Sequence, residues 1–332
     1  MKKKTKNLLL LVGLLLVVAV GYFALDLVPE KTAEEEQTVE ETVKIADFTT
    51  EDIIFYCYSN SNYEMGFNIT ENGYVHYKDE AFPANTAAVE AQLVTLEGLT
   101  AVKKIDSTEK EEYGLDVPSI TVAATLSDGR ERTFFFGDSA PLASGYYLLD
   151  VENNVIYLVE SSVYLRFDSS WSSMIQQEEM SLPTSDQIVD VTVETEGTKT
   201  MYIFYDEAKE QPWQLTTPEG TFDGDMDAVA TALGVYSTYS LLSTIEYNCN
   251  DFAQYGLEEP VTTVTVRYTE EEDTAVKALV FAFGNADADN NASYVRINGS
   301  DYVYSMSEYY AESIAVFDVE ELKYQPETEA GE

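Results

Sequence analysis

Hydrophobic and polar residues follow one order along this chain, and the chain repeats that order. Short runs rich in Val, Ile, Tyr and Phe come first and predict strands, and a stretch with apolar residues at helical spacing follows. The predicted strands are residues 53–58, 65–69 and 74–77 in the first copy, and residues 188–193, 201–205 and 213–215 in the second. The predicted helices are residues 85–96 and 225–236. Each half of the chain therefore begins with strands and continues with one main helix.

A distinctive turn follows the predicted helix in both copies. Tyr113-Gly114-Leu115-Asp116-Val117-Pro118 recurs as Tyr255-Gly256-Leu257-Glu258-Glu259-Pro260, and Phe134-Phe135-Phe136-Gly137 recurs as Phe281-Ala282-Phe283-Gly284. Glycine supplies a positive φ in such a turn, and proline blocks the continuation of a helix. Four more predicted strands close each copy, and Asp128-Gly129, Asn153-Asn154 and Asn298-Gly299 are hairpin signals between them.

The spacing of the two copies defines the architecture. A period of about 145 residues is far longer than the roughly 20 to 50 residues of solenoid repeats, so it indicates a duplicated domain. We expect an α+β fold of two tandem domains of antiparallel strands with one main helix each, after an N-terminal transmembrane helix. The expected segments are a cytoplasmic basic flank and anchor (1–26), an acidic flexible stalk (27–46), the first repeat (47–181), the second repeat (182–324) and a disordered acidic tail (325–332).

The N-terminal residues indicate where the chain resides. Four lysines among the first six residues precede residues 8–25, an uncharged apolar run whose length just spans a hydrocarbon core at about 1.5 Å per residue. Because basic flanks stay in the cytoplasm, we expect a single-pass protein of the cell membrane with an extracytoplasmic main portion. A cleavable signal peptide is the alternative, but Tyr22-Phe23-Ala24 is a poor cleavage site.

The net charge of the expected exterior portion limits which classes of partner it can bind. Setting aside the four N-terminal lysines and Asp26 leaves 15 of the 19 Lys+Arg and 59 of the 60 Asp+Glu, a formal charge near -44. Such a field repels phosphate backbones and anionic headgroups, so we expect no nucleic acid and no membrane-surface ligand.

Two cysteines, Cys57 and Cys249, occupy non-corresponding places in the two copies. They either pair across the copies or remain buried thiols.

One motif resembles a catalytic sequence. Gly137-Asp138-Ser139 is similar to the nucleophile motif of one esterase group, and a nucleophilic serine needs a base within hydrogen-bond reach. The only histidine is His76, and the second copy has Ala286 in place of the serine. We therefore interpret the motif as a turn that ends a strand.

An acidic cluster resembles a metal site. Asp223, Asp225 and Asp227 have the opening spacing of a calcium loop, but Ala228 and Gly234 occupy the positions that need glycine and a bidentate glutamate. We interpret Asp225 as the cap of the following helix. Zinc spacings, phosphate loops and dinucleotide fingerprints are missing from the sequence, so we expect no catalytic residue, no cofactor and no metal.

The order of these motifs resembles the family of domain of unknown function 4340. The resemblance covers about residues 47–317 and is sharpest at Tyr113 to Pro118, at Phe136-Gly137-Asp138 and at Val155-Ile156-Tyr157. It implies a membrane-anchored exterior protein, since such members are known and some are encoded beside components of ABC-type transporters.

These observations lead to a hypothesis of function. We expect a non-enzymatic binding or scaffold protein that is accessory to an ABC-type transporter and contacts its permease. The candidate partner-binding residues are Tyr113, Gly114, Leu115, Asp116, Pro118, Gly137 and Asp138. The alternative is a cell-envelope glycan-binding protein or a hydrolase that uses carboxylates.

Overall fold

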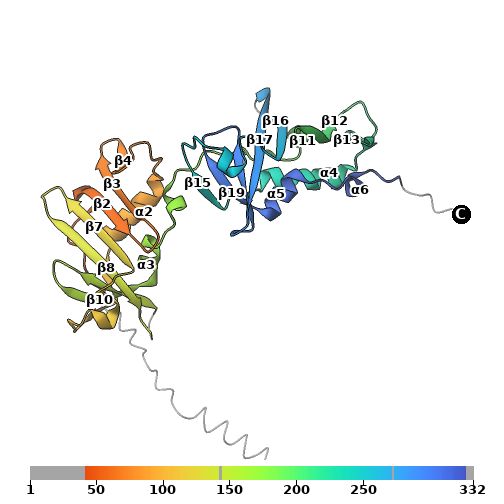
Figure 1. Ribbon diagram of the computed structural model, residues 1–332. Coiled ribbons are helices and arrows are strands. Elements are labelled where there is room, and N and C mark those ends of the chain that lie inside the picture. Colours follow the sequence, from red (N-terminus) through yellow and green to blue (C-terminus); the bar gives the residue numbers. More distant parts are fainter. Residues whose placement is uncertain (1–41, 142–143, 271–272, 327–332) are drawn as a thin grey trace, which may run out of the picture.

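The computed structural model describes residues 42–141, 144–270 and 273–326. These residues form two β-rich domains that Figure 1 shows as two lobes. The expected anchor, residues 8–25, and most of the expected stalk and tail lie outside the described residues. Within the part of the chain that is described, no helix is long and apolar enough to cross a membrane.

The first domain contains a single eight-stranded sheet. Its elements are β1 Val43–Lys44, η1 Thr50–Asp52, β2 Ile53–Ser59, β3 Glu64–Thr70, β4 Gly73–His76, α2 Thr86–Glu97, β5 Thr100–Ala101, β6 Lys103–Ile105, η2 Glu111–Tyr113, β7 Ile120–Leu126, β8 Glu131–Ser139, β9 Gly145–Asp150, β10 Val155–Glu160, α3 Ser161–Phe167 and η3 Trp171–Met174. The strand order is β4-β3-β2-β7-β8-β9-β10-β6, and a separate pair joins β1 to β5.

The second domain contains a nine-stranded sheet with the order β14-β13-β12-β11-β16-β17-β18-β19-β15. Its elements are β11 Ile188–Thr195, β12 Thr198–Tyr205, β13 Trp213–Thr217, β14 Gly220–Asp223, α4 Met226–Leu233, η4 Gly234–Ser237, β15 Ser243–Glu246, η5 Ala253–Tyr255, β16 Thr262–Glu270, β17 Asp273–Asp287, β18 Ala292–Ile297, β19 Val303–Ser307, α5 Glu308–Ala315 and α6 Val319–Leu322. Apart from the additional edge strand β14, the two sheets have the same connectivity.

The equivalence of the two domains extends to single hydrogen bonds. The Asn85 N–H donates to the Met174 carbonyl over 2.8 Å, and the Asp225 N–H donates to the Leu322 carbonyl over 2.8 Å. Asn85 and Asp225 are the N-cap residues of α2 and α4. In each domain, therefore, an equivalent backbone hydrogen bond joins the N-cap of the main helix to a residue near the C-terminal end of that domain.

The predicted strands and both predicted helices are present, and the coarse α+β expectation is confirmed. The elements that the pattern did not predict include the short helices α3, α5 and α6 and the edge strands β6, β14 and β15. The predicted second helix, residues 225–236, is an α-helix only to Leu233 and continues as the 3-10 turn η4.

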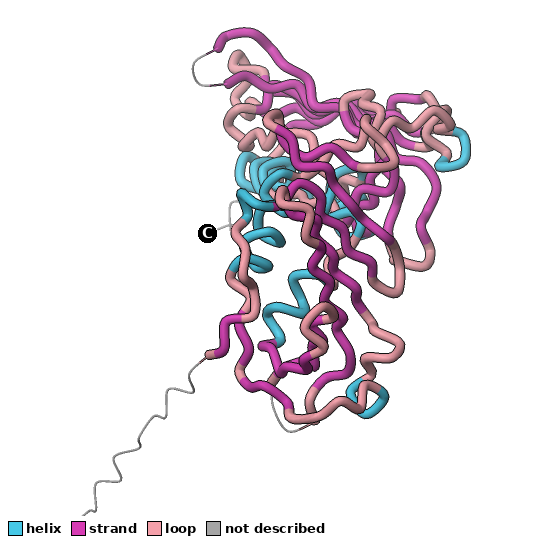
Figure 2. Tube along the Cα trace, turned by 90° about the vertical axis from the view of Figure 1, so that its left-hand side faces the viewer, coloured by secondary structure: helices cyan, strands magenta, loops and turns pink. Residues whose placement is uncertain are grey.

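The cores lie between the sheets and the helices. Val89, Leu93 and Leu96 of α2 pack onto the first sheet, and Val229 and Leu233 of α4 pack onto the second. Figure 2 shows most of the helical segments close together beside the strands. Smaller apolar clusters around Leu115 and Leu257 form separately from the main cores.

The segment before β2 belongs to the first domain. Ile45 and Ala46, which the sequence assigned to the stalk, are buried in its core together with Phe48. Val43 and Lys44 pair with β5. Burial of apolar side chains thus draws the start of the folded domain a few residues before Asp47.

Aromatic side chains join the two domains. The Tyr247 O–H of the second domain donates to Asp79 Oδ2 of the first over 2.6 Å. The Tyr247 ring lies 5.3 Å from the ring of Phe82 and 6.0 Å from that of Trp171. We call Asp79, Phe82, Trp171 and Tyr247 the domain junction.

Candidate partner-binding site

The structure forms the Tyr-Gly-Leu turn as the sequence predicts. The 3-10 turn η2 ends at Gly114, whose φ of 68° lies in the left-handed region. The Gly114 N–H donates to the Glu111 carbonyl over 3.2 Å, and the Leu115 N–H donates to the Lys110 carbonyl over 3.0 Å. The Leu115 side chain is buried against Leu149. A positive φ at Gly114 therefore turns the chain so that Leu115 enters an apolar cluster.

The turn packs directly on strand β8. A Cβ atom on Gly137 would lie 2.1 Å from the Tyr113 carbonyl oxygen, and a Cβ atom on Gly114 would lie 2.7 Å from the Asp138 Cγ. The structure thus brings Tyr113, Gly114, Gly137 and Asp138 together, although more than 20 residues separate the two pairs. Glycine is required at both positions because the two backbone segments touch.

The outward side of the turn is acidic and partly apolar. Asp116 and Asp138 are exposed, and Val117 is 80% exposed. Pro118 is half-buried. This side offers carboxylate acceptors and one apolar side chain, which suits a cationic or amide-bearing partner.

The same turn exists in the second domain. Gly256 has φ 70°, and a Cβ atom on it would lie 2.5 Å from the Asn285 Oδ1. The rings of Tyr113 and Tyr147 lie 4.6 Å apart, as those of Tyr255 and Tyr294 lie 5.0 Å apart. Because both copies keep this packing, its first role is to hold the turn against the sheet of its own domain. Partner binding at the turn of the first copy stays a prediction.

One contact distinguishes the second turn. The Tyr255 O–H donates to Glu246 Oε2 over 2.8 Å. Burial, and then this bond to the carboxylate, raise the pKa of Tyr255 well above its ordinary value. Ile105 occupies the corresponding edge-strand position of the first domain and packs near Tyr113.

The Gly-Asp-Ser motif does not form a nucleophile–base pair. Ser139 lies at the end of β8 and His76 lies on β4, with β3, β2 and β7 between these strands. The His76 ring packs 4.9 Å from the ring of Phe82. Burial, the largest influence, lowers the pKa of His76. The motif is therefore the end of a strand, as the alanine in place of this serine in the second copy indicated.

The acidic cluster before α4 caps that helix. Asp225 Oδ1 accepts hydrogen bonds from the Asp227 N–H over 3.1 Å and the Ala228 N–H over 2.9 Å. Across residues 42–141, 144–270 and 273–326, no three His, Cys, Asp or Glu side chains are grouped to hold a metal ion. Cys57 and Cys249 are both free thiols.

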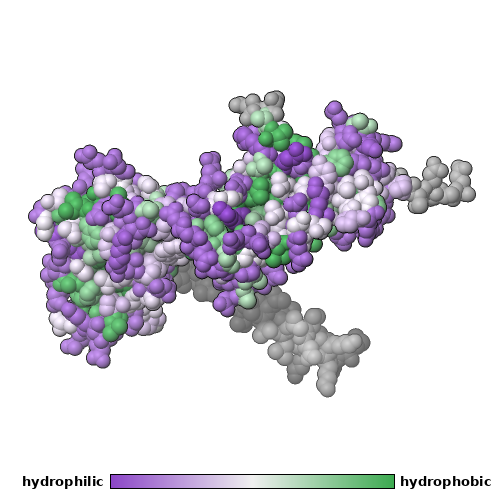
Figure 3. Space-filling model, turned by 45° about the horizontal axis from the view of Figure 1, so that its top comes forward, coloured by the Kyte–Doolittle hydropathy of each residue, from purple (hydrophilic) through white to green (hydrophobic). Residues whose placement is uncertain are grey.

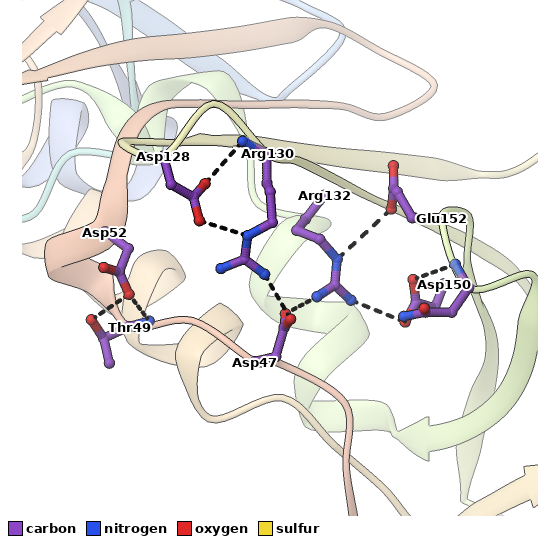
Figure 4. A network of polar contacts seen from close by, with 9 residues as sticks. Asp47, Thr49, Asp52, Asp128, Arg130, Arg132, Asp150 and Glu152 are labelled. Carbon is purple, nitrogen blue, oxygen red and sulfur yellow. Dashed lines mark hydrogen bonds and ion pairs between the residues drawn. The ribbon is translucent and has the colours of Figure 1, made fainter.

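Sequence reasoning missed an ion-pair cluster in the first domain that surrounds the buried Arg132 (Figure 4). Arg132, with its side chain 5% exposed, pairs through Nη2 with Asp150 Oδ2 over 3.0 Å, and the Asp150 side chain is 1% exposed. Arg132 also pairs with Asp47 of the segment before β2. Arg130 joins Asp47 to Asp128, each over 2.7 Å. We call these five residues the Arg132 cluster.

The Asp128 end of the cluster shows how its charges are held. The Arg130 N–H, and then the Arg130 guanidinium, lower the pKa of Asp128 below its usual value.

The sequence does contain a signal for the Arg132 cluster. Arg132 lies two residues before Phe134, and the second copy has Leu279 two residues before Phe281. A charge at a position that is apolar in the other copy indicates that its side chain has a polar partner in the fold.

Comparisons with known proteins give one match. The family model described as Domain of unknown function (DUF4340) matches residues 75–244 and 213–324. These ranges run from within β4 to the end of the described second domain, which is more than half of the chain. No curated protein and no solved structure matches the chain.

Proposed function

The chain belongs to the domain of unknown function 4340 (DUF4340) family, and on this premise we propose that it is a non-catalytic binding or scaffold protein. In this proposal an uncleaved N-terminal helix anchors it in the cell membrane with the N-terminus in the cytoplasm. Both domains then lie outside the cytoplasm, where they serve as an accessory to an ABC-type transporter complex.

The observation that carries the proposal is the order of the chain: a basic flank and an uncharged apolar run precede two joined, strongly acidic domains. In this proposal the anchor holds a folded, negatively charged body close to the membrane surface, where permease loops are exposed. The resemblance to the family favours a transporter complex as the partner. Two motifs that resemble a catalytic and a metal site have other roles in the structure: Ser139 ends strand β8, and Asp225 caps helix α4.

Crosslinking in intact cells tests the proposal. A photoreactive residue is placed at Asp116 or at Asp138, the two exposed carboxylates of the first turn, and a matched control carries it at the corresponding Glu258 of the second turn. We expect capture of a transporter permease from positions 116 and 138 and weaker capture from position 258. Equal capture from all three positions would remove the first turn as the contact.

Glycan binding is the second candidate function. Exposed tyrosine rings such as Tyr309 and Tyr205 are surfaces on which sugar rings stack, and carboxylates accept hydroxyl hydrogen bonds. Isothermal titration of the full-length protein with cell-wall glycan fragments separates the two candidates. Saturable glycan binding together with no permease crosslink would replace the transporter proposal.

A further inference from the structure

Two grooves meet on the helix side of the second domain. One has a volume of about 430 Å³ and lies between α4 and the α5–α6 segment. The other, about 640 Å³, lies between that segment and strands β11 and β12. Val316 and Phe317 line both grooves. We call Tyr309, Val316, Phe317 and Val319 the Val316 surface; its members line one or both grooves.

The Val316 surface exposes large apolar and aromatic side chains to solvent, although burial of such side chains is favourable. Tyr309 is 72% exposed and Val316 is 69% exposed. Exposed apolar side chains that cluster beside grooves of this size mark binding surfaces more often than scattered ones do. Tyrosine is also enriched among residues that dominate binding energy in protein interfaces.

The first domain is an internal control for this surface. Helices α3 and α5 both start directly after the last strand of their sheet, and their seventh residues, Phe167 and Ile314, are both fully buried. This register places the exposed residue Ser162 opposite Tyr309. The same helix therefore forms with serine at the position of Tyr309, so the fold does not require an aromatic side chain there.

The rim of the surface is acidic. Glu219, Asp318, Glu320 and Glu321 line the two grooves, and the residues that line them include no lysine or arginine. Lys323 is nearby, but its Nζ pairs with Glu320 over 2.5 Å. On the face that Figure 3 shows, hydrophilic residues predominate and hydrophobic residues form separate patches. The Val316 surface thus combines an apolar centre with a negative edge.

We propose that the Val316 surface binds a polypeptide segment of a partner protein, one that presents apolar side chains flanked by lysine or arginine, as a basic amphipathic helix does. Apolar side chains fill the two grooves, and the flanking cations meet the rim carboxylates of Glu219, Asp318 and Glu321. Anionic lipid headgroups would be repelled by the rim. A second copy of this chain would bring a second strongly acidic domain against it, since the whole chain has a formal charge of -41.

This inference deepens the proposed function by naming the chemistry of the partner, but its test is separate from the transporter assignment. The full-length chain is placed in nanodiscs of zwitterionic lipid, and empty nanodiscs give the background. The probes are three fluorescent peptides: a leucine–lysine helix, a serine–lysine peptide of equal charge and a leucine–glutamate helix. We expect the leucine–lysine helix to bind at least tenfold more tightly than the other two.

The decisive variant is Tyr309→Ser with Val316→Ser. The first change introduces the residue that the first domain has at the equivalent helix position, and the second removes an apolar side chain that is 69% exposed. We expect it to fold as the wild type does, by circular dichroism, and to lose at least tenfold in affinity for the leucine–lysine helix. Leu165→Ser is the matched control, because Leu165 is a 61% exposed side chain on the equivalent helix α3. It should bind as the wild type does.

Three results would overturn the inference. They are unchanged affinity in the double variant, an equal loss in the Leu165→Ser control, and binding of the serine–lysine peptide as tight as that of the leucine–lysine helix. Concentration-dependent self-association of the wild type that the double variant abolishes would assign the surface to a second copy instead. None of these results depends on whether a permease is captured from the first turn.

Discussion

Single residues hold this fold at places where two backbone segments touch. Gly114 and Gly256 combine a positive φ with close contact to the residue after the glycine of the facing strand. An L side chain at such a position is strained by its backbone and also displaces its neighbour.

The first prediction concerns Gly114. Gly114→Ala should lower the free energy of unfolding by about 1 to 3 kcal/mol, because the left-handed backbone disfavours a Cβ atom and Asp138 lies in its place. Urea denaturation followed by circular dichroism measures this loss. Gly129→Ala is the control: Gly129 has φ 87° and no atom within 4 Å of its missing Cβ. A loss at Gly114 no larger than that at Gly129 would show that contact with Asp138 adds nothing.

Residues that act locally were predictable from sequence, and residues that act at long range were not. Positive φ at Gly114 and the cap at Asp225 depend on neighbours a few residues away, so the pattern was sufficient. Arg132 meets Asp47 from 85 residues away, and only the closed sheet brings them together. The partner of a buried charge is set by topology, which a list of charged residues does not contain.

At one pair of equivalent strand positions, the two domains bury side chains of different chemistry. Arg132 and Asp150 of β8 and β9 correspond to Leu279 and Ile297 of β17 and β18, because Phe134 pairs with Asp150 as Phe281 pairs with Ile297. Leu279 and Ile297 are both buried. A buried ion pair in one copy is therefore an apolar pair in the other.

The second prediction follows from this exchange. Arg132→Leu alone should destabilise the protein by about 3 to 5 kcal/mol, because it leaves the Asp150 carboxylate buried without its partner. Arg132→Leu combined with Asp150→Ile should recover at least half of this loss, although it also removes the Asp150 bond to the Asn153 amide. Urea denaturation of the single and double variants provides the comparison. A double variant as unstable as the single one would mean that Asp47 and Arg130 need the ion pair.

Short elements were the least predictable ones. The edge strands β6 and β15 have only three and four residues, and α3 has seven. Such lengths are too short for a period of two or of 3.6 residues to stand out. The strands and helices with several periods of pattern were predicted close to their observed limits.

The third prediction concerns the domain junction and pH. The Tyr247 O–H, and then the Ala81 N–H, lower the pKa of Asp79 below 3.8, while burial, and then Asp79, raise the pKa of Tyr247 well above 10.0. A carboxyl group whose pKa is lowered by folding stabilises the folded state at pH values above its unfolded-state pKa, and this stability is lost as the pH falls through its folded-state pKa. A tyrosine whose pKa is raised by folding stabilises the folded state at pH values below its unfolded-state pKa, and this stability is lost as the pH rises through its folded-state pKa. The contact should therefore hold between about pH 4 and pH 10.

Trp171, stacked near Tyr247, reports on this contact. In a Trp213→Phe background, its fluorescence should stay constant across that window and change in more acidic solution. Asp79→Asn keeps an oxygen acceptor without a titrating group, so it should suppress the acid transition of this signal. An identical acid transition in the Asp79→Asn variant would assign it to other carboxylates.

At the scale of the whole molecule, the sequence predicted a duplicated domain, and the matching strand orders of the two sheets agree with that duplication. It did not predict how the copies meet, because the junction uses side chains such as Phe82 and Tyr247 whose patterns resemble ordinary core positions. It also did not predict the Val316 surface, since exposure of an apolar residue after a short helix depends on the three-dimensional fold.

The fourth prediction concerns topology. If residues 8–25 anchor the chain with its N-terminus in the cytoplasm, protease added to intact, wall-stripped cells should digest both domains. An antibody against a tag placed before Lys2 should detect its epitope only after the cells are lysed. Protection of the domains in intact cells would contradict the proposed orientation.

The short pairing of β1 with β5 has a mechanical meaning. Any tension that enters the protein from its N-terminal side reaches the first domain through residues 43–48, and there it meets a two-residue strand pair and the ion pairs of Asp47. Strand β2 of the eight-stranded sheet follows these contacts in the chain. The segment before β2 is thus where such a load first meets the folded domain, and the burial of Ile45, Ala46 and Phe48 in the core adds apolar contacts to the strand pair and the ion pairs.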